Sequence, residues 1–481
     1  MPKRTLITFI RSSLVALGSA AWLAGCSLAP SFSTPEAPIA SDWGSEIPAA
    51  EPGAAGEPSS VSLNWRTFVI DERLHDLIET ALANNRDLRQ ALLNVEAARA
   101  QYGIQRSDRL PTLQVEGSGQ RERVPGDLSA SGRSTTQSRY QAGVGLATYE
   151  LDVFGRVKNL SEAAMQEFLA TEEVARSARI SLISDIIRTY VIRNGAIERK
   201  RLSEQVLETR EASLQLMADR LKLGAATELD YQEALGLVEQ ARVDLERVER
   251  EIRQTTNALT LLVGVPDVRP QLFAKRPSDR GIVQDLAPGA PSELLEHRPD
   301  IRAAEHRLRG RNANIGAARA AFFPRLSLTG SFGSASAELS DLFGSGQESW
   351  SFAPRLTLPI FDGGRNEANL DLAKVRKDLA VAEYEKVIQS AFREVSDAIA
   401  AKETLQMETR ARRALVQTSE MRLQLSRARY ENGADDYSRY LDAQRQSFRN
   451  RSALVQVQTE QKLALADLFR ALGGGWQITE R

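Results

Sequence analysis

The sequence predicts an α+β membrane protein built from an internal duplication, with four strands and two pairs of long helices per chain. Three observations support this prediction. The chain begins with a lipoprotein-type leader, two long tracts contain no proline, and one pattern of residues recurs at a nearly constant spacing. A helix as long as these tracts cannot be buried inside a globule of this chain length, so an ordinary compact enzyme is disfavoured.

The composition excludes several functional classes. The 481 residues carry 62 basic and 63 acidic side chains, a formal charge of −1, which lacks the basic surplus of nucleic-acid-binding proteins. Three histidines and a single cysteine leave little for a metal site or a thiol nucleophile, and one cysteine cannot form an internal disulfide. The sequence therefore predicts no metal, no cofactor and no nucleic-acid partner.

The N-terminus has the pattern of a secretory signal peptide over residues 1–25. Basic residues precede an apolar stretch from about residue 12 to residue 23, and small residues follow it. The ending Leu-Ala-Gly-Cys resembles the lipobox of bacterial lipoproteins, which implies that Cys26 is acylated and becomes the mature N-terminus. Ser27 follows in place of Asp, which favours the outer membrane. The alternative is a plain signal peptide with an incidental cysteine.

Residues 26–64 are rich in Ala, Pro, Ser and Gly and show neither a helical nor a strand period. This composition predicts an extended tether that follows the lipid anchor.

The two proline-free tracts, Gly126–Val265 and Ile360–Arg481, carry apolar residues at helical spacing. The first includes a stripe at positions 182, 183, 186, 187, 190 and 191. The pattern predicts four long helices, at about 158–223, 227–264, 366–431 and 436–472. The tract that ends at Leu223 would be roughly 96 Å long at 1.5 Å per residue.

The chain repeats itself. Ala100, Gly103 and Arg106 recur 213 positions later, and Gly224 recurs as Gly433 at a spacing of 209. A nearly constant spacing that preserves glycines at turns indicates duplication of one long unit. The first repeat spans 65–265, a proline-rich connector spans 266–299, and the second repeat spans 300–481.

Each repeat contains two segments of apolar and polar alternation, which predict strands at about 111–120, 139–151, 324–333 and 351–361. About ten residues is the length of a membrane-spanning strand. Alternation alone equally fits two hairpins on a soluble core, but the leader favours the membrane. Four strands leave open edges, which lipid does not tolerate, so several chains must join. Two chains would give eight strands with a filled interior, and three would give twelve strands around a lumen.

Four runs of residues carry a resemblance to a known family. They are Tyr-Glu-Leu-Asp-Val-Phe-Gly-Arg at 149–156, Arg-Pro-Asp-Ile-Arg-Ala-Ala-Glu at 298–305, Ala-Arg-Ala-Ala-Phe-Phe-Pro at 318–324 and Leu-Pro-Ile-Phe-Asp-Gly-Gly-Arg at 358–365. From Trp65 to Leu472 the chain resembles the TolC-like outer-membrane factors, specifically the NodT-like lipoprotein branch that serves multidrug efflux pumps of the resistance-nodulation-division type.

The resemblance implies a homotrimer with a trimeric twelve-stranded β-barrel in the outer membrane, four strands per chain, continued by a long α-helical barrel in the periplasm. Such a protein is a passive exit duct, with a periplasmic adaptor, an inner-membrane pump and outer-membrane lipid as partners. The alternative is a periplasmic coiled-coil lipoprotein scaffold without a channel. Nothing in the sequence forms a nucleotide-binding loop, a zinc motif or a nucleophile elbow, so no enzyme activity is predicted.

Two helix turns would lie at the free periplasmic tip, where they would contact the adaptor. Gly224 and Gly433 follow the long helices as C-terminal stops, and Thr227 and Asp435 are expected to cap the next helices. The alternative is that Gly224 and Gly433 are present only because a turn between two helices favours glycine.

The resemblance also assigns a gate to the last long helix. It places charged roles on Asp442 and Arg445, with Tyr430 and Tyr440 as latch partners. A ring of Asp442 side chains would attract cations unless partners neutralise it. The alternative is that Asp442 merely pairs with Arg445 three residues later on a solvated helix face.

Overall fold

The computed structural model describes residues 27–40, 43, 64–130, 132–273, 281–283, 286 and 291–474. The predicted signal peptide and Cys26 lie outside these residues. The chain forms two compact units. The first unit combines Met1–Glu36, Asn94–Glu172 and Ala303–Tyr384, and the second combines Ala37–Leu93, Glu173–Arg302 and Glu385–Arg481. Both sequence repeats thus contribute segments to both units.

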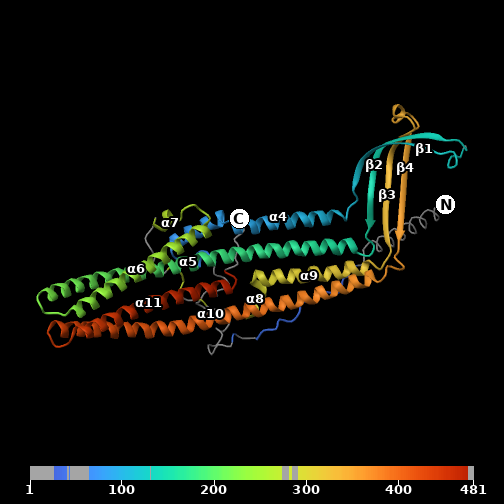
Figure 1. The fold of residues 1–481 in the computed structure, drawn as a ribbon. Helices are drawn as coiled ribbons and strands as arrows, with labels where there is room; N and C mark the ends of the chain where they lie inside the picture. Colours follow the sequence, from blue (N-terminus) through green and yellow to red (C-terminus); the bar gives the residue numbers. More distant parts are fainter. Residues whose placement is uncertain are drawn as a thin grey trace, which may run out of the picture. The chain divides into compact units, whose positions relative to one another are not determined.

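The first unit contains one four-stranded antiparallel sheet in the order β1-β2-β3-β4 (Figure 1). Its strands are β1 Leu113–Val124, β2 Thr135–Leu151, β3 Arg325–Ser336 and β4 Glu348–Thr357. Among the described residues, β1 pairs only with β2 and β4 pairs only with β3. Both edges of the sheet are therefore unpaired within one chain.

All four strands differ from the predicted bounds by a few residues, and the largest differences are at the ends of β1, β2 and β4. The ladder between β1 and β2 continues past residue 120 to the pair Val124 and Thr135. The extra residues are mostly polar, so apolar alternation does not reveal them. The strand predicted at 351–361 ends at Thr357. Pro359 lacks a backbone donor for a ladder, and Gly363 follows with a φ of 68°.

Many large apolar side chains on the sheet are exposed in the single chain. Val115 on β1 is 85% exposed, Trp350 on β4 is 75% exposed and Leu356 on β4 is 67% exposed. Exposed apolar side chains on both edge strands indicate a surface that lipid or another chain covers.

The helices account for most of the described chain. They are α2 Trp65–Phe68, α3 Glu72–Asn84, α4 Arg86–Ser107, α5 Arg156–Lys222, α6 Glu228–Val263, α7 Arg269–Phe273, α8 Pro291–His297, α9 Pro299–Ala320, α10 Arg365–Glu431 and α11 Tyr437–Ala471. A short 3₁₀ helix, Leu339–Asp341, precedes β4. The structure gives α5 and α10 67 residues each. None of the described helices combines the length and the apolar character needed to cross a membrane.

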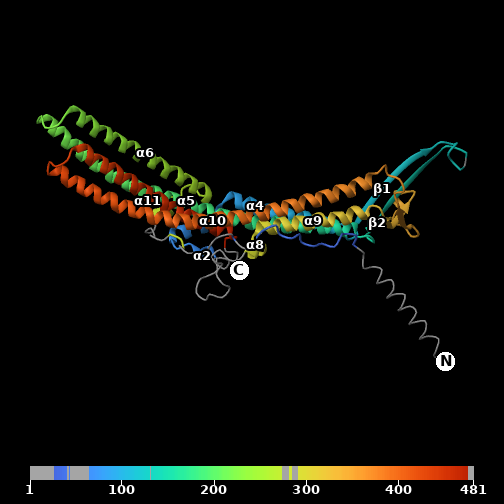
Figure 2. The ribbon, with the colours of Figure 1, turned by 90° about the horizontal axis from the view of Figure 1, so that it is seen from below.

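In the second unit, α5 and α6 form one helical hairpin and α10 and α11 form another, and the two hairpins lie side by side (Figures 1 and 2). The main core of this unit contains buried side chains from α2, α3, α5, α6, α10 and α11, with single residues from α4, α7 and α8. Phe68 stacks on Phe469 with ring centroids 4.3 Å apart. Tyr190, from the apolar stripe predicted at 182–191, is buried in the same core.

The duplication is visible as a repeated contact. The side-chain amide of Asn85, before α4, donates to the carbonyl of Leu262 at 2.8 Å. The guanidinium of Arg298, before α9, donates to the carbonyl of Ala471 at 2.8 Å. The donors and the acceptors are separated by the same spacings at which the sequence repeats. In both repeats, a side chain just before one helix donates to a carbonyl in the last turn of another helix. This side chain is Asn85 in the first repeat and Arg298 in the second.

Residues 27–40 form neither helix nor strand, and their first part is held against α5 and α9. The Ser27 hydroxyl donates to Asn159 at 2.9 Å, and Asn312 donates to the carbonyl of Pro30 at 2.9 Å. The guanidinium of Arg309 lies 5.1 Å from the ring centroid of Phe32. We call residues 27–34 the docked segment.

Replacing Gly316 with Ala is expected to displace the docked segment. A Cβ at position 316 would lie 2.5 Å from the Asn159 side chain and 2.7 Å from the backbone nitrogen of Ala29. Such overpacking costs about 1–3 kcal/mol. Limited proteolysis within residues 28–34 should accelerate about tenfold for each 1.4 kcal/mol lost. Gly103, the counterpart in the first repeat, has no atom within 4 Å of an added Cβ. Equal cleavage rates in Gly316→Ala and Gly103→Ala proteins would contradict the prediction.

Candidate gate at the helical hairpin ends

The two hairpin turns have the same backbone. Gly224 and Gly433 both have a φ of 71°, the left-handed conformation that glycine adopts without strain at a helix C-terminus. Thr227 begins α6 with a reciprocal capping box, in which its hydroxyl accepts from the Asp230 backbone and the Asp230 carboxylate accepts from the Thr227 backbone. The Thr227 hydroxyl donates to the Asp230 carboxylate at 2.7 Å, and this bond together with the one from the Thr227 backbone lowers the pKa of Asp230.

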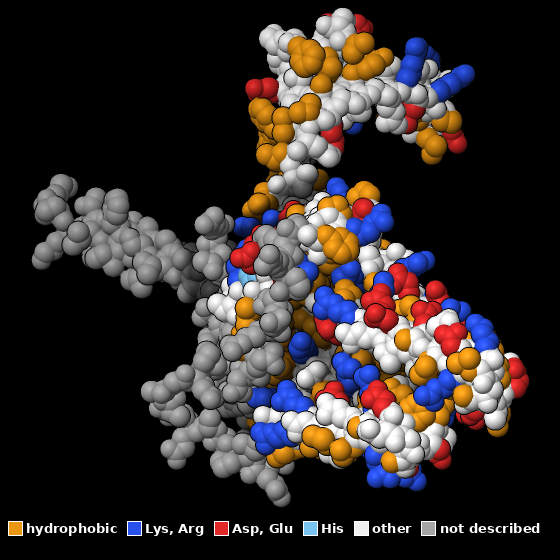
Figure 3. All heavy atoms as spheres, turned by 90° about the vertical axis from the view of Figure 1, so that its left-hand side faces the viewer, with side chains coloured by type: hydrophobic (Ala, Val, Ile, Leu, Met, Phe, Trp, Pro, Cys, Tyr) orange, Lys and Arg blue, Asp and Glu red, His pale blue; other side chains and the backbone are white. Residues whose placement is uncertain are grey.

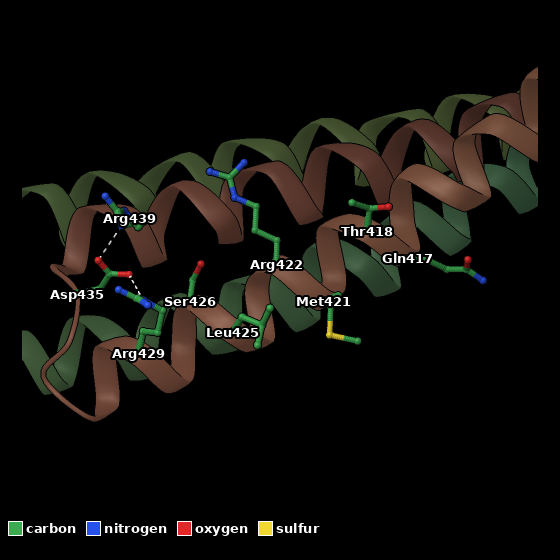
Figure 4. A pocket seen from close by; sticks show the side chains of 9 residues that line it. All are labelled: Gln417, Thr418, Met421, Arg422, Leu425, Ser426, Arg429, Asp435 and Arg439. Atoms are coloured by element: carbon green, nitrogen blue, oxygen red, sulfur yellow. Dashed lines mark hydrogen bonds and ion pairs between the residues drawn. The ribbon is translucent and has the colours of Figure 1, made fainter.

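The expectation that Asp435 caps the following helix is wrong. Asp436 is the cap of α11, where its carboxylate accepts from the backbone of Arg439 at 3.1 Å. Asp435 instead bridges the two helices of the hairpin, at 2.6 Å from Arg429 on α10 and 2.8 Å from Arg439 on α11 (Figure 4). The physical reason is register: Asp436 aligns with Thr227 when the two turns are superposed on their glycines.

A small hydrophobic cluster joins the two hairpins behind the turns. It contains Met217 from α5, Ala234 and Leu237 from α6, and Tyr437 and Leu441 from α11, with Tyr430 and Tyr440 packed against it. We call this group the tip cluster. Tyr430 stacks on Tyr440 with ring centroids 5.7 Å apart and an interplanar angle of 7°. Burial raises the pKa of Tyr430, and it raises the pKa of Tyr437 to about 12, so both phenols are neutral at physiological pH.

Arg220 links the two hairpins through its contacts with Tyr430. Its guanidinium lies 5.2 Å from the ring centroid of Tyr430 and also donates to the Tyr430 hydroxyl. The arginine is on α5 and the tyrosine is on α10, so this contact crosses between the hairpins. A partly desolvated cation–π contact is worth about 0.5–2 kcal/mol.

Asp442 and Arg445 lie on α11 and contact each other. Their side chains are 3.4 Å apart and are 65% and 41% exposed. This is the i, i+3 pairing that was the alternative to a gate, and it contributes little within one chain because water screens it. Exposed charges on one helix face nevertheless remain available to a neighbouring copy.

A groove of about 670 Å³ runs along α10 and reaches the start of α11 (Figure 4). Its floor includes the exposed apolar side chains of Met421 and Leu425. Its end is closed by the pairs that Asp435 makes with Arg429 and Arg439. Toward the hairpin ends, basic and acidic side chains are interspersed with apolar ones (Figure 3).

Sequence reasoning missed most of the tip cluster and its contacts, including Met217, Arg220 and Tyr437. A signal for Arg220 was present, because Arg220 and Arg429 occupy equivalent positions in the two repeats. The structure gives both a role at the tip, one toward Tyr430 and the other toward Asp435. The described residues contain no group of three metal-ligating side chains.

Comparison with known proteins identifies the class. The model of the family described as outer membrane efflux protein matches residues 77–265 and 290–474. Outer membrane protein OprJ of Pseudomonas aeruginosa is 56% identical over 455 residues, which cover 94% of each chain. The probable efflux pump outer membrane protein TtgC of Pseudomonas putida is 42% identical over 465 residues, which cover 96% of each chain.

Solved structures agree with these relatives. A membrane protein from Pseudomonas aeruginosa has a TM-score of 0.89 and 56% identity, and the match covers 94% of this chain and 98% of that one. The open state of the Neisseria gonorrhoeae MtrE outer membrane channel has a TM-score of 0.83 and 38% identity, with coverage of 94% and 99%.

These matches define an outer membrane channel of the TolC-like type, which confirms the predicted α+β membrane fold class. The chain belongs to the outer membrane efflux protein family. Its function is passage of efflux substrates out of the cell through the outer membrane, and it is not an enzyme. The coiled-coil scaffold without a channel, which was the alternative, is not favoured.

Proposed function

We propose that three copies of the chain join edge to edge and enclose one exit duct through the outer membrane. The observation that supports this proposal is the sheet with two unpaired edges, β1 and β4. In lipid each unpaired backbone group costs several kcal/mol, so β4 of one copy must pair with β1 of the next. Three copies then supply a closed barrel of twelve strands with room for a lumen.

The proposed partners follow from the same assembly. Acylation at Cys26 anchors each copy in outer-membrane lipid, and the docked segment holds the anchored end against α5 and α9. A periplasmic adaptor contacts the turns at Gly224, Thr227, Gly433 and Asp435 and connects the duct to an inner-membrane pump. The apolar floor of the groove beside α10 is suited to a helix of the adaptor.

Two measurements test this function together. In mild detergent, the mass of the purified protein should equal three chains, and the trimer should carry a steady ion current in a planar bilayer. A well-ordered single subunit that stays in lipid would refute the edge-to-edge assembly. A folded trimer that remains silent, even after opening mutations at the tip, would favour the scaffold.

The proposed gate lies at the hairpin ends and includes Asp442, Arg445, Tyr430 and Tyr440. The tip cluster holds the two hairpins of one chain together. The exposure of Asp442 and Arg445 supports a role for them in contacts between copies.

Replacing Asp442 with Ala, alone or together with Arg445→Ala, is expected to raise single-channel conductance because contacts between copies at the closed tip are lost. The increase should shrink at high salt, where surface charges are screened over about 3 Å at 1 M. Unchanged conductance in both variants would remove this pair from the gate. Arg412→Ala, which breaks an exposed i, i+4 pair with Glu408 elsewhere on α10, serves as the control.

A further inference from the structure

The first unit contains a hollow of about 330 Å³ that is lined by arginines. They are Arg156 on α5, Arg311 on α9, Arg325 at the start of β3 and Arg376 on α10. Polar and apolar side chains complete the lining, among them Asn314 and Leu372.

The hollow carries excess positive charge. Glu150 neutralises Arg156 through two bonds, of 2.8 Å and 2.6 Å. Arg311, Arg325 and Arg376 are exposed and form no hydrogen bond or ion pair with any side chain in the described part of the chain, although the charge of Arg325 also acts on Glu150. Three guanidinium groups without a hydrogen-bonded carboxylate around one cavity favour an anionic occupant, because guanidinium binds carboxylate, sulfonate or phosphate oxygens through paired hydrogen bonds.

The hollow and the docked segment lie on opposite faces of α9. Asn312 and Gly316 face the docked segment, whereas Ala318 lines the hollow. Two residues along an α-helix turn the side chain by about 200°. In the proposed trimer, acylation at Cys26 would place the docked segment on the outside of the assembly. The opposite face of α9, with the hollow, would then face the bore.

We propose that this hollow is an anion-binding station in the bore of the duct, which takes the negatively charged group of a small amphipathic molecule. The three unpaired arginines bind the anionic group, and Leu372 contacts its apolar part. The inference rests on the proposed trimeric duct for its position in the bore. The binding itself depends only on residues within one chain.

The test compares the wild-type trimer with an Arg311→Gln, Arg325→Gln, Arg376→Gln variant, using naphthalene-1-sulfonate as the probe. Equilibrium binding in detergent is followed by the fluorescence of the probe, and block of the ion current is followed in planar bilayers. The variant should bind the sulfonate about tenfold more weakly or worse, the loss expected when one charge-assisted hydrogen bond is removed. Its reversal potential in a KCl gradient should shift toward cation selectivity.

Lys158→Gln is the matched control. Lys158 is an exposed cation two residues after Arg156 on α5, and it does not line the hollow. It should leave both sulfonate binding and reversal potential unchanged. If the triple variant unfolds, Arg376→Gln alone gives the same readouts with one charge removed per chain.

Equal sulfonate binding by the wild-type and triple-variant trimers would overturn the proposal. So would an unchanged reversal potential combined with loss of co-purifying anionic phospholipid, because the arginines would then serve a lipid headgroup. A wild-type trimer that binds the sulfonate but carries no ion current would refute the proposed duct. The same result would support the anion-binding site.

Discussion

Replacing Asp71 with Ala is expected to destabilise the second unit by about 3–5 kcal/mol, because it leaves a buried arginine without its carboxylate. Asp71 is 1% exposed and Arg73 is 7% exposed. The Asp71 carboxylate accepts from the Arg73 guanidinium at 3.2 Å and from the Tyr190 hydroxyl at 2.7 Å. It also accepts from the Arg73 backbone and so caps α3.

Two further variants separate the contributions to this effect. Tyr190→Phe removes only one donor to a charged acceptor and should cost about 1.5–3 kcal/mol. Asp71→Ala combined with Arg73→Met removes both charges and should recover part of the loss. Thermal unfolding of the detergent-solubilised protein, followed by far-ultraviolet circular dichroism, gives the order of the three. Equal midpoints for Asp71→Ala and Tyr190→Phe would show that burial of the arginine is not the dominant cost.

The long helices could be predicted from sequence because their determinants are local. Proline is absent from both tracts, and the apolar stripe that contains Tyr190 follows the helical period. The two turns could also be predicted from local sequence. A glycine that follows a helix commonly adopts the left-handed conformation, and Gly224 and Gly433 both do so. The sequence repeat indicates the correct cap of α11, because it aligns Asp436, and not Asp435, with Thr227.

Side-chain partners across elements could not be predicted, because they depend on how distant segments pack. Nothing near Arg220 in the sequence indicates Tyr430, 210 positions away. The contacts of residues 27–34 with α5 and α9 likewise join segments that are far apart in the sequence. Gly316 makes room for Ala29, but its counterpart Gly103 is an equally good match to the repeat and has open space around it. The repeat therefore identifies the glycine at position 316 but does not indicate that this glycine makes room for the docked segment.

Replacing Tyr430 with Ala is expected to open the tip more than any change at Asp442. Tyr430 combines stacking on Tyr440, a contact with Tyr437 at 5.3 Å between ring centroids, and both contacts with Arg220. Aromatic pairs are worth about 0.5–1.5 kcal/mol each beyond burial, and the cation–π contact adds to them. By contrast, the bond between Asp442 and Arg445 is exposed and lies within one helix.

Single-channel recording of Tyr430→Ala should therefore show higher conductance or a larger open fraction, with a change of about tenfold for each 1.4 kcal/mol of contact energy lost. Tyr430→Phe keeps the ring contacts and loses only the hydroxyl, so it should lie between wild type and Tyr430→Ala. Tyr231, the first-repeat counterpart of Tyr440, is outside the tip cluster, and Tyr231→Ala is the control for loss of an aromatic ring near the turns. Because the tip cluster joins hairpins within one chain, Tyr430→Ala should open the tip even when high salt has already weakened charged contacts between copies. Conductance equal to that of Tyr231→Ala at every salt concentration would show that the gate depends on contacts between copies alone.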